Sequence, residues 1–353
     1  MGNEQHDSGS ATYHEILSQP AAWQQALALV NQEGGALRAL WQAGQFAEVI
    51  FTGCGSTYYL SVAAAALFQQ LTGTRAKGAP AGELVLNPEL YYAQGGAVLL
   101  VAVSRSGSTT ETVHAVNAFR KARRGTVITV SNYGDRPLST LGAVNIAITA
   151  GQEESVAQTR SFASMYVATT ALAVLLAEEP ALLQQMEQVP ALGERLLTQY
   201  GTLAQEFGSN LALDRFYFLG SGIRYGLACE VNLKMKEMTL THSEPFHFLE
   251  FRHGPISMVG ASAAVIAMLS QSNRGDEEAV LHDVRQLGGQ VLTIGEEKVD
   301  VAFGSGLAEA IRSVLYLPVP QLIAYHRAIA KGLTPDRPNN LNAVVTLDWS
   351  ARG

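Results

Sequence analysis

The sequence contains one stretch twice: FTGCGSTYYL at residues 51–60 and FLGSGIRYGL at residues 218–227. The two glycines, the tyrosine and the final leucine all recur at an offset of 167 residues. Two further pairs follow in the same order, SRS at 104–106 with SQS at 270–272, and GTVITV at 125–130 with GQVLTI at 289–294. Matches in one order at nearly constant spacing predict a duplicated domain.

Each copy alternates short apolar strands with helices. Continuous apolar strands that are each followed by a helix are typical of a parallel sheet covered on both faces. We therefore expect an α/β protein with two tandem, doubly wound parallel sheets related by internal duplication. The expected strands are residues 49–52, 97–103 and 126–130 in the first copy and 216–219, 264–269 and 291–294 in the second, and the expected helices are residues 58–71, 109–123, 226–240 and 276–287.

The repeat also suggests where the domains begin and end. An N-terminal extension is expected over residues 1–35, with a leading helix around residues 23–40. The first domain is expected over residues 36–190 and the second over residues 205–353. The uncharged stretch 161–177 is short for a membrane span and is expected to be a buried helix, with a polar helical connector over 178–208.

The composition excludes several classes of partner. The 353 residues include 24 Lys and Arg against 31 Asp and Glu, which gives a formal charge of −7. An acidic chain without basic clusters does not favour nucleic acid or anionic membranes. The first seven residues have no basic start and no apolar stretch, so no signal peptide is expected. The two cysteines, Cys54 and Cys229, are too few for a disulfide framework, which suits a reducing cytoplasm.

A loop rich in hydroxyl groups follows the expected strand 97–103. It runs SRSGST over residues 104–109 and leads directly into a helix. Backbone N–H groups and the positive end of the helix dipole favour an anion at such a place, and the hydroxyls can complete its coordination. The alternative is a simple N-cap, but five hydroxyls among residues 104–110 exceed what one cap needs. We expect a phosphate site here, to which Arg105 can add a charged contact.

The loop GCGST at residues 53–57 differs from a dinucleotide-binding fingerprint. The third glycine is missing, because Tyr58 stands there, and no acidic residue lies about 20 positions on. We therefore do not expect NAD. A close approach of the backbone to a sugar hydroxyl fits better, and Cys54 is expected to be a small buried thiol rather than a nucleophile.

Two further segments carry titratable residues. Glu230, Lys234 and Glu237 share one face of an expected helix, so they form either a solvated ion-pair stripe or a buried carboxylate with a tuned pKa. Three histidines fall within residues 242–253, but their spacing matches no zinc pattern. A loop that presents His253, braced by Gly254 and Pro255, is the better interpretation.

Together these motifs resemble the sugar isomerase (SIS) family, whose domains are flavodoxin-like. The tandem arrangement is similar to the isomerase half of glucosamine-6-phosphate synthases, and the resemblance extends from about Glu15 to Asp348. The motifs that carry it are CGST at 54–57, SRSGST at 104–109, VAQTRS at 156–161, ExxxKxxE at 230–237, ExxHGP at 250–255, YHxxxxKG at 325–332 and DRPxNL at 336–341.

The resemblance implies roles for individual residues. Ser104, Ser106 and Thr109 would hold the substrate phosphate. Glu237 would be the base that moves a proton between C1 and C2 of the sugar. The supporting members would be Glu230 and Lys234, and His253 would assist ring opening from a partner subunit, so a homodimer is expected. The other positions expected to bind the substrate or its phosphate are Cys54, Gly55, Ser56, Thr57, Arg105, Val156 and Gln158.

Departures from the family pattern narrow the expected reaction. Ala343 stands where the synthase has its Schiff-base lysine, so no covalent imine is expected there. Residue 2 is Gly where an amidotransferase has its nucleophilic Cys, so no glutamine-dependent amidotransfer is expected. Arg105 and Gln158 replace a Gln and a Ser of the synthase, which alters the phosphate pocket.

The parts that remain predict an isomerase or deaminase of an amino-sugar or ketosamine 6-phosphate, of the glucosamine-6-phosphate deaminase type. A fructosamine-6-phosphate deglycase and a tagatose- or galactosamine-type ketose–aldose isomerase are close alternatives. A regulatory protein that senses a sugar phosphate without catalysis is an alternative of another class. No metal and no other cofactor is implied.

Overall fold

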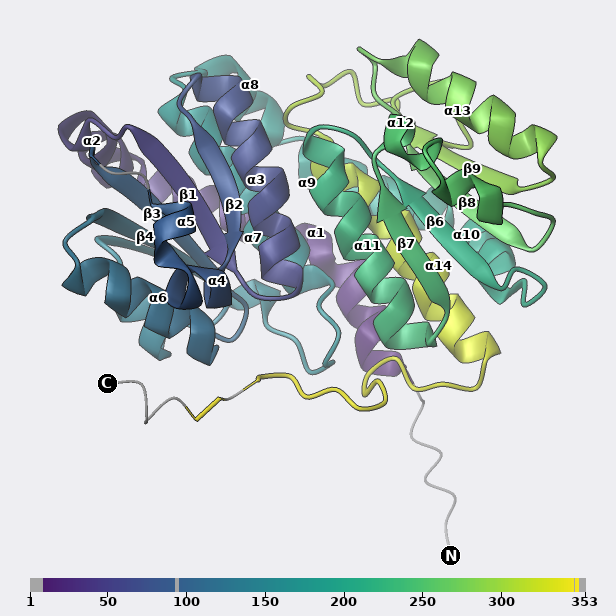
Figure 1. The fold of residues 1–353 in the computed structure, drawn as a ribbon, viewed down its shortest axis with the longest axis horizontal. Coiled ribbons are helices and arrows are strands. Elements are labelled where there is room, and N and C mark those ends of the chain that lie inside the picture. Colours follow the sequence, from purple (N-terminus) through teal and green to yellow (C-terminus); the bar gives the residue numbers. More distant parts are fainter. Residues whose placement is uncertain (1–8, 93–94, 346, 349–353) are drawn as a thin grey trace, which may run out of the picture. The chain divides into compact units, whose positions relative to one another are not determined.

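The computed structural model describes residues 9–92, 95–345 and 347–348, so the N-terminal residues used for the signal-peptide prediction lie outside the described chain. The chain forms two compact units, each built around one five-stranded sheet (Figure 1). The first unit consists of residues 21–152, 160–187 and 342–353. The second consists of residues 1–20, 153–159 and 188–341. Helix α1 (Ser10–Gln32) contributes to both units.

The first unit contains a fully parallel sheet in the order β2-β1-β3-β4-β5. All seven residues of its central strand β3 are buried, as expected of a strand covered on both faces. The strands are β1 (Glu48–Gly53), β2 (Ala76–Pro80), β3 (Val98–Ser104), β4 (Gly125–Ser131) and β5 (Val144–Ala147). The helices are α2 (Gly34–Gly44), α3 (Ser56–Thr72), α4 (Ala81–Leu86), α5 (Pro88–Tyr91), α6 (Thr110–Lys121), α7 (Arg160–Leu176) and α8 (Pro180–Met186).

Alternate residues of the first sheet face opposite layers of helices. Ile50 and Leu100 join the apolar cluster that includes residues of α4 and α6. Phe51 points to the other face, where its ring lies 5.7 Å from that of Phe68 in α3. Helix α3 in turn packs against the buried helix α7.

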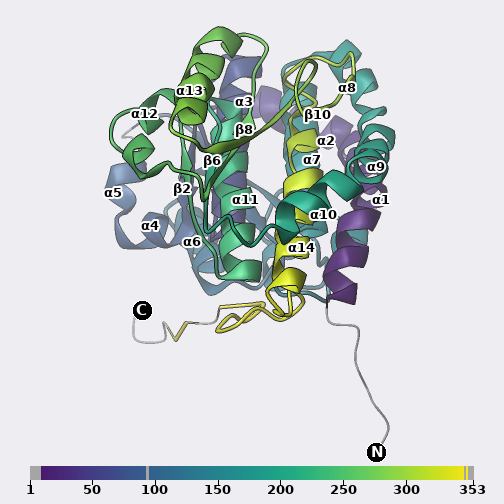
Figure 2. The ribbon, with the colours of Figure 1, turned by 90° about the vertical axis from the view of Figure 1, so that its right-hand side faces the viewer.

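The second unit repeats this arrangement, with the strand order β10-β9-β8-β6-β7. Figure 2 shows α12 and α13 on one side of its sheet and α10 and α14 on the other. The strands are β6 (Arg215–Leu219), β7 (His242–Phe246), β8 (Ala263–Met268), β9 (Gln290–Gly295) and β10 (Val301–Ala302). The helices are α9 (Val189–Gln199), α10 (Gly201–Ser209), α11 (Ile223–Thr239), α12 (Phe248–Phe251), α13 (Arg274–Gln286) and α14 (Pro318–Ala330).

Both sheets have the same topology. Counted from its own first strand, each has the order 2-1-3-4-5, which is the flavodoxin-type doubly wound arrangement. The predicted fold class, with two tandem and internally repeated α/β domains, is therefore confirmed.

Two local predictions were wrong. The expected leading helix is two helices, α1 and α2, with a break at Glu33 beside Gly34 and Gly35, which are poor helix formers. The segment 242–246, expected to be part of a loop, is strand β7. It pairs with β6 at the edge of the sheet, where Pro245 is tolerated because one side of the strand needs no partner.

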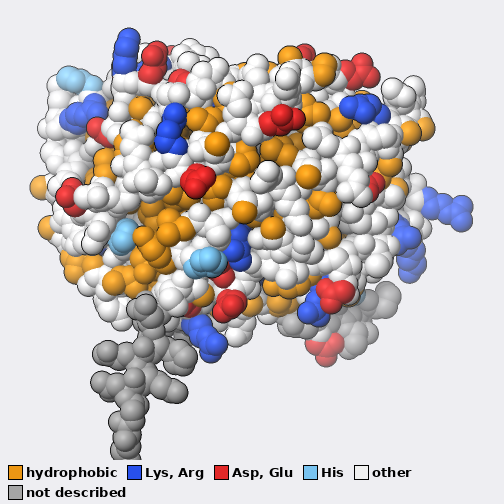
Figure 3. All heavy atoms as spheres, turned by 180° about the vertical axis from the view of Figure 1, so that it is seen from behind, with side chains coloured by type: hydrophobic (Ala, Val, Ile, Leu, Met, Phe, Trp, Pro, Cys, Tyr) orange, Lys and Arg blue, Asp and Glu red, His pale blue; other side chains and the backbone are white. Residues whose placement is uncertain are grey.

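Some large hydrophobic side chains reach the surface. Tyr13, Leu17 and Ile329, all in the second unit, are 39–40% exposed. Figure 3 shows hydrophobic side chains gathered on the face of the molecule opposite that of Figure 1. Among the helices of the described residues, none combines the length and apolar character needed to cross a bilayer.

Candidate active site

The loops after β1 and β3 lie where the strand order of the first sheet changes direction. Ligands of doubly wound sheets bind in the crevice outside the carboxyl ends of the strands, at such a switch point. Residues 54–57 follow β1 and residues 105–109 follow β3, its neighbour. Cys54 Sγ lies 3.6 Å from Thr112 Oγ1, which joins the first loop to the helix that the second loop enters. Both predicted substrate-binding loops of the first copy are thus together.

The loop after β3 gathers its hydroxyl groups around Thr109. Thr109 Oγ1 lies 3.1 Å from Ser104 Oγ and 3.4 Å from Ser106 Oγ. The turn depends on Gly107, whose φ of 64° is unfavourable for other residues, and a Cβ there would lie 2.8 Å from Arg136 Cβ. The backbone therefore curls tightly and turns several hydroxyls toward one another.

The loop is more than an N-cap for α6. Thr109 occupies the N-cap position, but its side chain makes no capping hydrogen bond. The first backbone N–H groups of any helix have no acceptor within the helix. At the start of α6 these N–H groups adjoin a cluster of neutral hydroxyls, and the positive end of the helix dipole favours an anion at such a place.

Arg105 reaches away from this turn to the C-terminal segment. Its side chain is buried, and Nη2 donates a hydrogen bond of 2.6 Å to the carbonyl oxygen of Ala343. Leu347 N–H in turn donates to Thr110 Oγ1 at 3.1 Å. Ala343 and Leu347 are thereby attached to the hydroxyl-rich loop within the first unit.

The loop after β1 is braced by Thr57. The Thr57 hydroxyl accepts the Cys54 N–H and donates to the Cys54 carbonyl, both at 2.9 Å. Gly55 adopts φ 55° and ψ −123°, a conformation that glycine supplies most easily. Burial raises the pKa of the Cys54 thiol to about 11, so this thiol is neutral near pH 7 and a poor nucleophile. Ser56, next to Gly55, is largely buried.

Three charged side chains form a row on α11 in the second unit. Lys234 Nζ lies 2.5 Å from Glu237 Oε2 and 3.3 Å from Glu230 Oε1. The side chains of Glu230 and Lys234 are 0% and 1% exposed, whereas that of Glu237 is 20% exposed. Burial would lower the pKa of the Lys234 ammonium, but the carboxylates of Glu230 and Glu237 outweigh this and the pKa is raised. The row is therefore a buried ion-pair chain with one accessible carboxylate at its end.

The segment 153–159 belongs to the same unit as this row. The charge of Glu153 contributes to the raised pKa of Lys234, and Glu153 accepts hydrogen bonds from the N–H and hydroxyl of Thr159. Val156 N–H donates to the Asp336 carbonyl at 2.9 Å. Gln158 Oε1 is buried and accepts no hydrogen bond within the described residues. The predicted residues Val156 and Gln158 thus lie on a tightly held loop that is electrostatically coupled to Lys234.

The three histidines of residues 242–253 have different surroundings. Across residues 9–92, 95–345 and 347–348, no three His, Cys, Asp or Glu side chains are grouped as metal ligands. His247 instead stacks on Tyr225, with ring centroids 3.8 Å apart. His253 is exposed just before Gly254, whose φ is 127°. In the described part of the chain its side chain makes no hydrogen bond or ion pair with Glu237.

The predicted residues thus fall into two groups. The first unit holds positions 54–57 and 104–109, and the second holds Glu237 with its partners, the loop 153–159 and His253. Sequence reasoning missed Glu153, which acts on Lys234, and Glu15, which accepts the N–H groups of Glu154 and Ser155. No local spacing could have revealed either, because their partners are distant in the sequence.

Two curated proteins are similar to this chain over most of its length. The glutamine–fructose-6-phosphate aminotransferase (isomerizing) of Methanothermobacter thermautotrophicus is 27% identical over 348 residues, covering 95% of this chain and 57% of the relative. That of Gloeobacter violaceus is 31% identical over 365 residues, covering 95% of this chain and 58% of the relative. The chain therefore spans somewhat more than half the length of these curated relatives.

Solved structures match nearly the whole chain. Glucosamine-6-phosphate deaminase from Thermotoga maritima superposes with a TM-score of 0.79 at 25% identity, covering 96% of this chain and 100% of that one. Tagatose-6-phosphate ketose/aldose isomerase from Escherichia coli shares the fold, with a TM-score of 0.84 at 22% identity and 97% coverage of both chains. The profile of the SIS domain matches residues 45–175 and 213–318. This chain belongs to the SIS domain family.

Proposed function

We propose that this protein is a phosphosugar isomerase or deaminase that moves a proton between C1 and C2 of an amino-sugar or ketosamine 6-phosphate. The observation that carries the proposal is the Glu230–Lys234–Glu237 row, in which the buried ammonium of Lys234 orients one accessible carboxylate. A positioned carboxylate within reach of a C–H next to a carbonyl is the group that such a proton transfer needs.

The phosphate end of the substrate is assigned to the first unit. The hydroxyls of Ser104, Ser106 and Thr109 and the start of α6 offer neutral donors to a phosphate dianion. Gly55 and Ser56 would line the sugar, and Cys54 and Thr57 would shape that wall. Val156 and Gln158 are also proposed to contact the substrate, with the buried Gln158 Oε1 available to a substrate hydroxyl.

The proposed chemistry conserves protons at each step. Ring opening transfers the O1 proton to the ring oxygen, with His253 as carrier. Glu237 then takes the C2 proton of the open-chain 2-ammonio aldose while one ammonium proton passes to O1, which leaves an enolamine. Return of the Glu237 proton to C1 gives a protonated C2 imine, which water hydrolyses to a ketose and ammonium. With a hydroxyl at C2 the same transfer passes through an enediol and gives a ketose without loss of ammonia.

A homodimer is part of this proposal, because His253 is exposed and is assigned to the site of a partner subunit. The exposed hydrophobic side chains of the second unit supply surface suited to such a contact (Figure 3). A single monomeric species in light scattering that stays fully active on dilution would contradict it. We also assign the protein to the cytoplasm, in keeping with its free cysteines.

The relatives support this class of substrate. Those named above are a fructose-6-phosphate aminotransferase, a glucosamine-6-phosphate deaminase and a tagatose-6-phosphate isomerase. We place the deaminase/isomerase reaction first. Release of an amine from a fructosamine 6-phosphate and a plain ketose–aldose interconversion are the close alternatives.

The test is a substrate panel of hexosamine, fructosamine and ketose 6-phosphates, with detection of products by mass and of released ammonia or amine. Glu237→Gln should lower turnover by about 10²–10⁴-fold and leave phosphosugar affinity nearly unchanged. Glu206→Gln, an exposed position on α10, is the matched control and should keep full turnover. Tight phosphosugar binding without turnover of any substrate would instead assign a sensing role, and unchanged turnover in Glu237→Gln would remove this residue as the base.

A further inference from the structure

The second copy repeats part of the backbone geometry of the loops after β1 and β3. Gly222, after β6, has φ 59° and ψ −130°, close to φ 55° and ψ −123° at Gly55 after β1. Ser270 Oγ accepts the N–H of the residue three positions on at 2.9 Å, as Ser104 Oγ does at 3.2 Å. Strands β6 and β8, which precede these loops, are neighbours at the switch point of the second sheet. The turn itself differs, because Asn273 at φ −116° stands where Gly107 has φ 64°. We call the loop 104–109 the first nest, and the loop 270–273 with Arg224 the second nest.

In the second nest, two carboxylates of the chain itself accept backbone N–H groups. Glu277 Oε2 accepts the Ser270 N–H at 2.6 Å. Glu309 Oε2 accepts the N–H of the next residue, Gln271, at 3.4 Å. Two successive backbone N–H groups after β8 thus donate to carboxylate oxygens. These carboxylates take the place that a bound anion would have.

A buried arginine neutralises both carboxylates. Arg224 takes the position that Thr57 has in the first copy, and its side chain is 5% exposed. Its Nη2 lies 3.6 Å from Glu277 Oε1, and its Nη1 donates to Glu309 Oε1. Arg224 Nε is buried without a hydrogen-bond partner among the described residues. The buried guanidinium therefore keeps hydrogen-bonding capacity at Nε that no group of the described residues uses.

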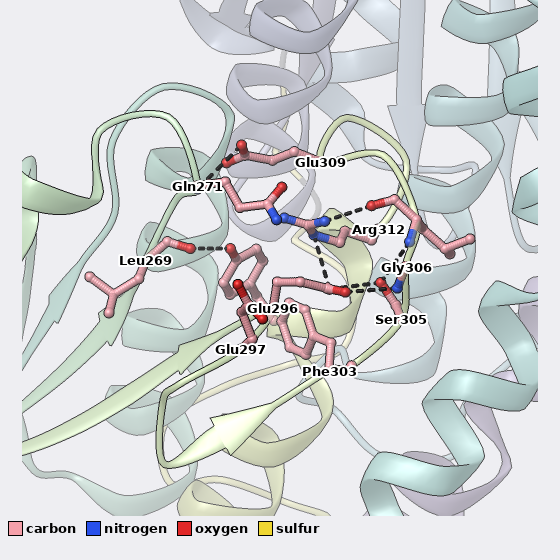
Figure 4. A network of polar contacts seen from close by, with 12 residues as sticks. Leu269, Gln271, Glu296, Glu297, Phe303, Ser305, Gly306, Glu309 and Arg312 are labelled. Carbon is pink, nitrogen blue, oxygen red and sulfur yellow. Dashed lines mark hydrogen bonds and ion pairs between the residues drawn. The ribbon is translucent and has the colours of Figure 1, made fainter.

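A loop after β10 brings Glu309 to this place. Figure 4 shows residues 303–312 curling beside Gln271 and Glu296. Glu296 accepts the Ser305 hydroxyl and the Gly306 N–H, each at 2.7 Å. Arg312, on the same loop, donates to the Leu307 carbonyl at 2.6 Å. The loop is pinned at both ends, so it holds Glu309 over the nest.

We propose that the second copy contains an anion-binding site for which Glu309 and Glu277 supply the anion, and that inorganic phosphate or a phosphate monoester binds there once Glu309 is removed. In the wild-type chain the first nest is then open to phosphate, whereas Glu277 and Glu309 occupy the second nest. The inference does not depend on the reaction proposed above, because it concerns only binding in the second unit.

The test uses the full chain with the first nest disabled by Ser106→Ala and Thr109→Val. In this background Glu309→Ala is compared with Glu278→Ala, which removes an exposed carboxylate that pairs only with Arg274 on α13 among the described residues. Melting midpoints are measured against inorganic phosphate at constant ionic strength, and stoichiometry by calorimetry. Glu309→Ala should show a saturable rise of about 5–10 °C at a phosphate concentration about 100 times the Kd, with one phosphate per chain.

The background chain and Glu278→Ala should show no such rise. If Glu309→Ala does not fold, Glu309→Gln keeps an oxygen for the Gln271 N–H while losing the charge, and a smaller saturable rise is expected. No rise in either Glu309 variant overturns the proposal. An equal rise in all chains overturns it too, because phosphate would then bind elsewhere.

Discussion

The nest after β3 and the nest after β8 share a serine that accepts the N–H of the residue three positions on, but they differ in the turn that follows and in chemistry. The first is lined by neutral hydroxyls of Ser104, Ser106 and Thr109. The second contains a buried arginine and two carboxylates. Duplication thus preserved strand order and glycine geometry while the side chains diverged. The difference teaches that a repeated fold does not imply a repeated site, since function depends on the side chains that the fold carries.

The largest expected effect concerns Arg224 and its counterpart Thr57. Arg224→Met leaves Glu277 and Glu309 without their counter-charge and should lower the free energy of unfolding by about 3–5 kcal/mol. Thr57→Val leaves only the Cys54 N–H unsatisfied and should cost about 1–3 kcal/mol. Urea unfolding of both variants measures this. Equal losses would mean that the charges of the second nest do not distinguish the two copies.

The serines at matching positions should differ in affinity. Ser106→Ala removes a hydroxyl assigned to the substrate phosphate and should weaken phosphosugar binding by about 10–100-fold. Ser272→Ala changes the corresponding, exposed position of the second copy and should leave affinity unchanged. Calorimetric titration of each variant with the preferred phosphosugar provides the test. Similar losses in both would refute the assignment of phosphate to the first nest alone.

The pH dependence of stability should reveal the carboxylate of the second nest. Burial, the largest cause, raises the pKa of Glu277 above its usual value, so the folded state binds this proton more tightly than the unfolded state. The resulting stabilisation is fully present below the unfolded pKa and is lost as pH rises through the folded pKa. Glu277→Gln cannot titrate there, so it should gain stability relative to the wild type as pH rises above about 4.5. Parallel stability curves in urea unfolding would contradict this.

The smallest effect is expected at Arg105. Arg105→Gln gives the first nest the residue that the second has, Gln271, and removes the hydrogen bond to the Ala343 carbonyl. Because Ala343 is exposed, water can replace this bond, and the loss of global stability should stay below about 1 kcal/mol. Hydrogen exchange of the Leu347 amide should nevertheless become faster. Unchanged exchange would mean that Arg105 does not hold the C-terminal segment.

The sequence predicted the centre of each sheet and missed its edges. The six expected strands correspond to β1, β3, β4, β6, β8 and β9, whereas the four that were not expected, β2, β5, β7 and β10, are all edge strands. Central strands are buried on both faces and give continuous apolar runs. Edge strands such as AKGAP and HSEPF are short and carry polar residues and proline, so they lack that signal.

In the two sites, contacts between residues close in the sequence could be predicted, and contacts between distant residues could not. The Glu230–Lys234–Glu237 row could be predicted because helical spacing of three and four residues places side chains together. The pairing of Arg224 with Glu309 could not, because 85 residues separate them and only the folded chain brings them into contact. The repeat aligns Arg224 with Thr57, but it does not show that Arg224 is paired with Glu277 and Glu309.

The second unit also joins the beginning of the chain to its far end. The Asp336 carboxylate accepts the Thr12 N–H at 2.7 Å and the Thr12 hydroxyl at 2.6 Å, across 324 residues. During synthesis on the ribosome, Thr12 has to wait until the chain has grown by a further 324 residues before this contact can form. The first sheet is translated in the meantime and can fold early, so the last step of maturation should be the capture of the N-terminal helix by residues near the C-terminus.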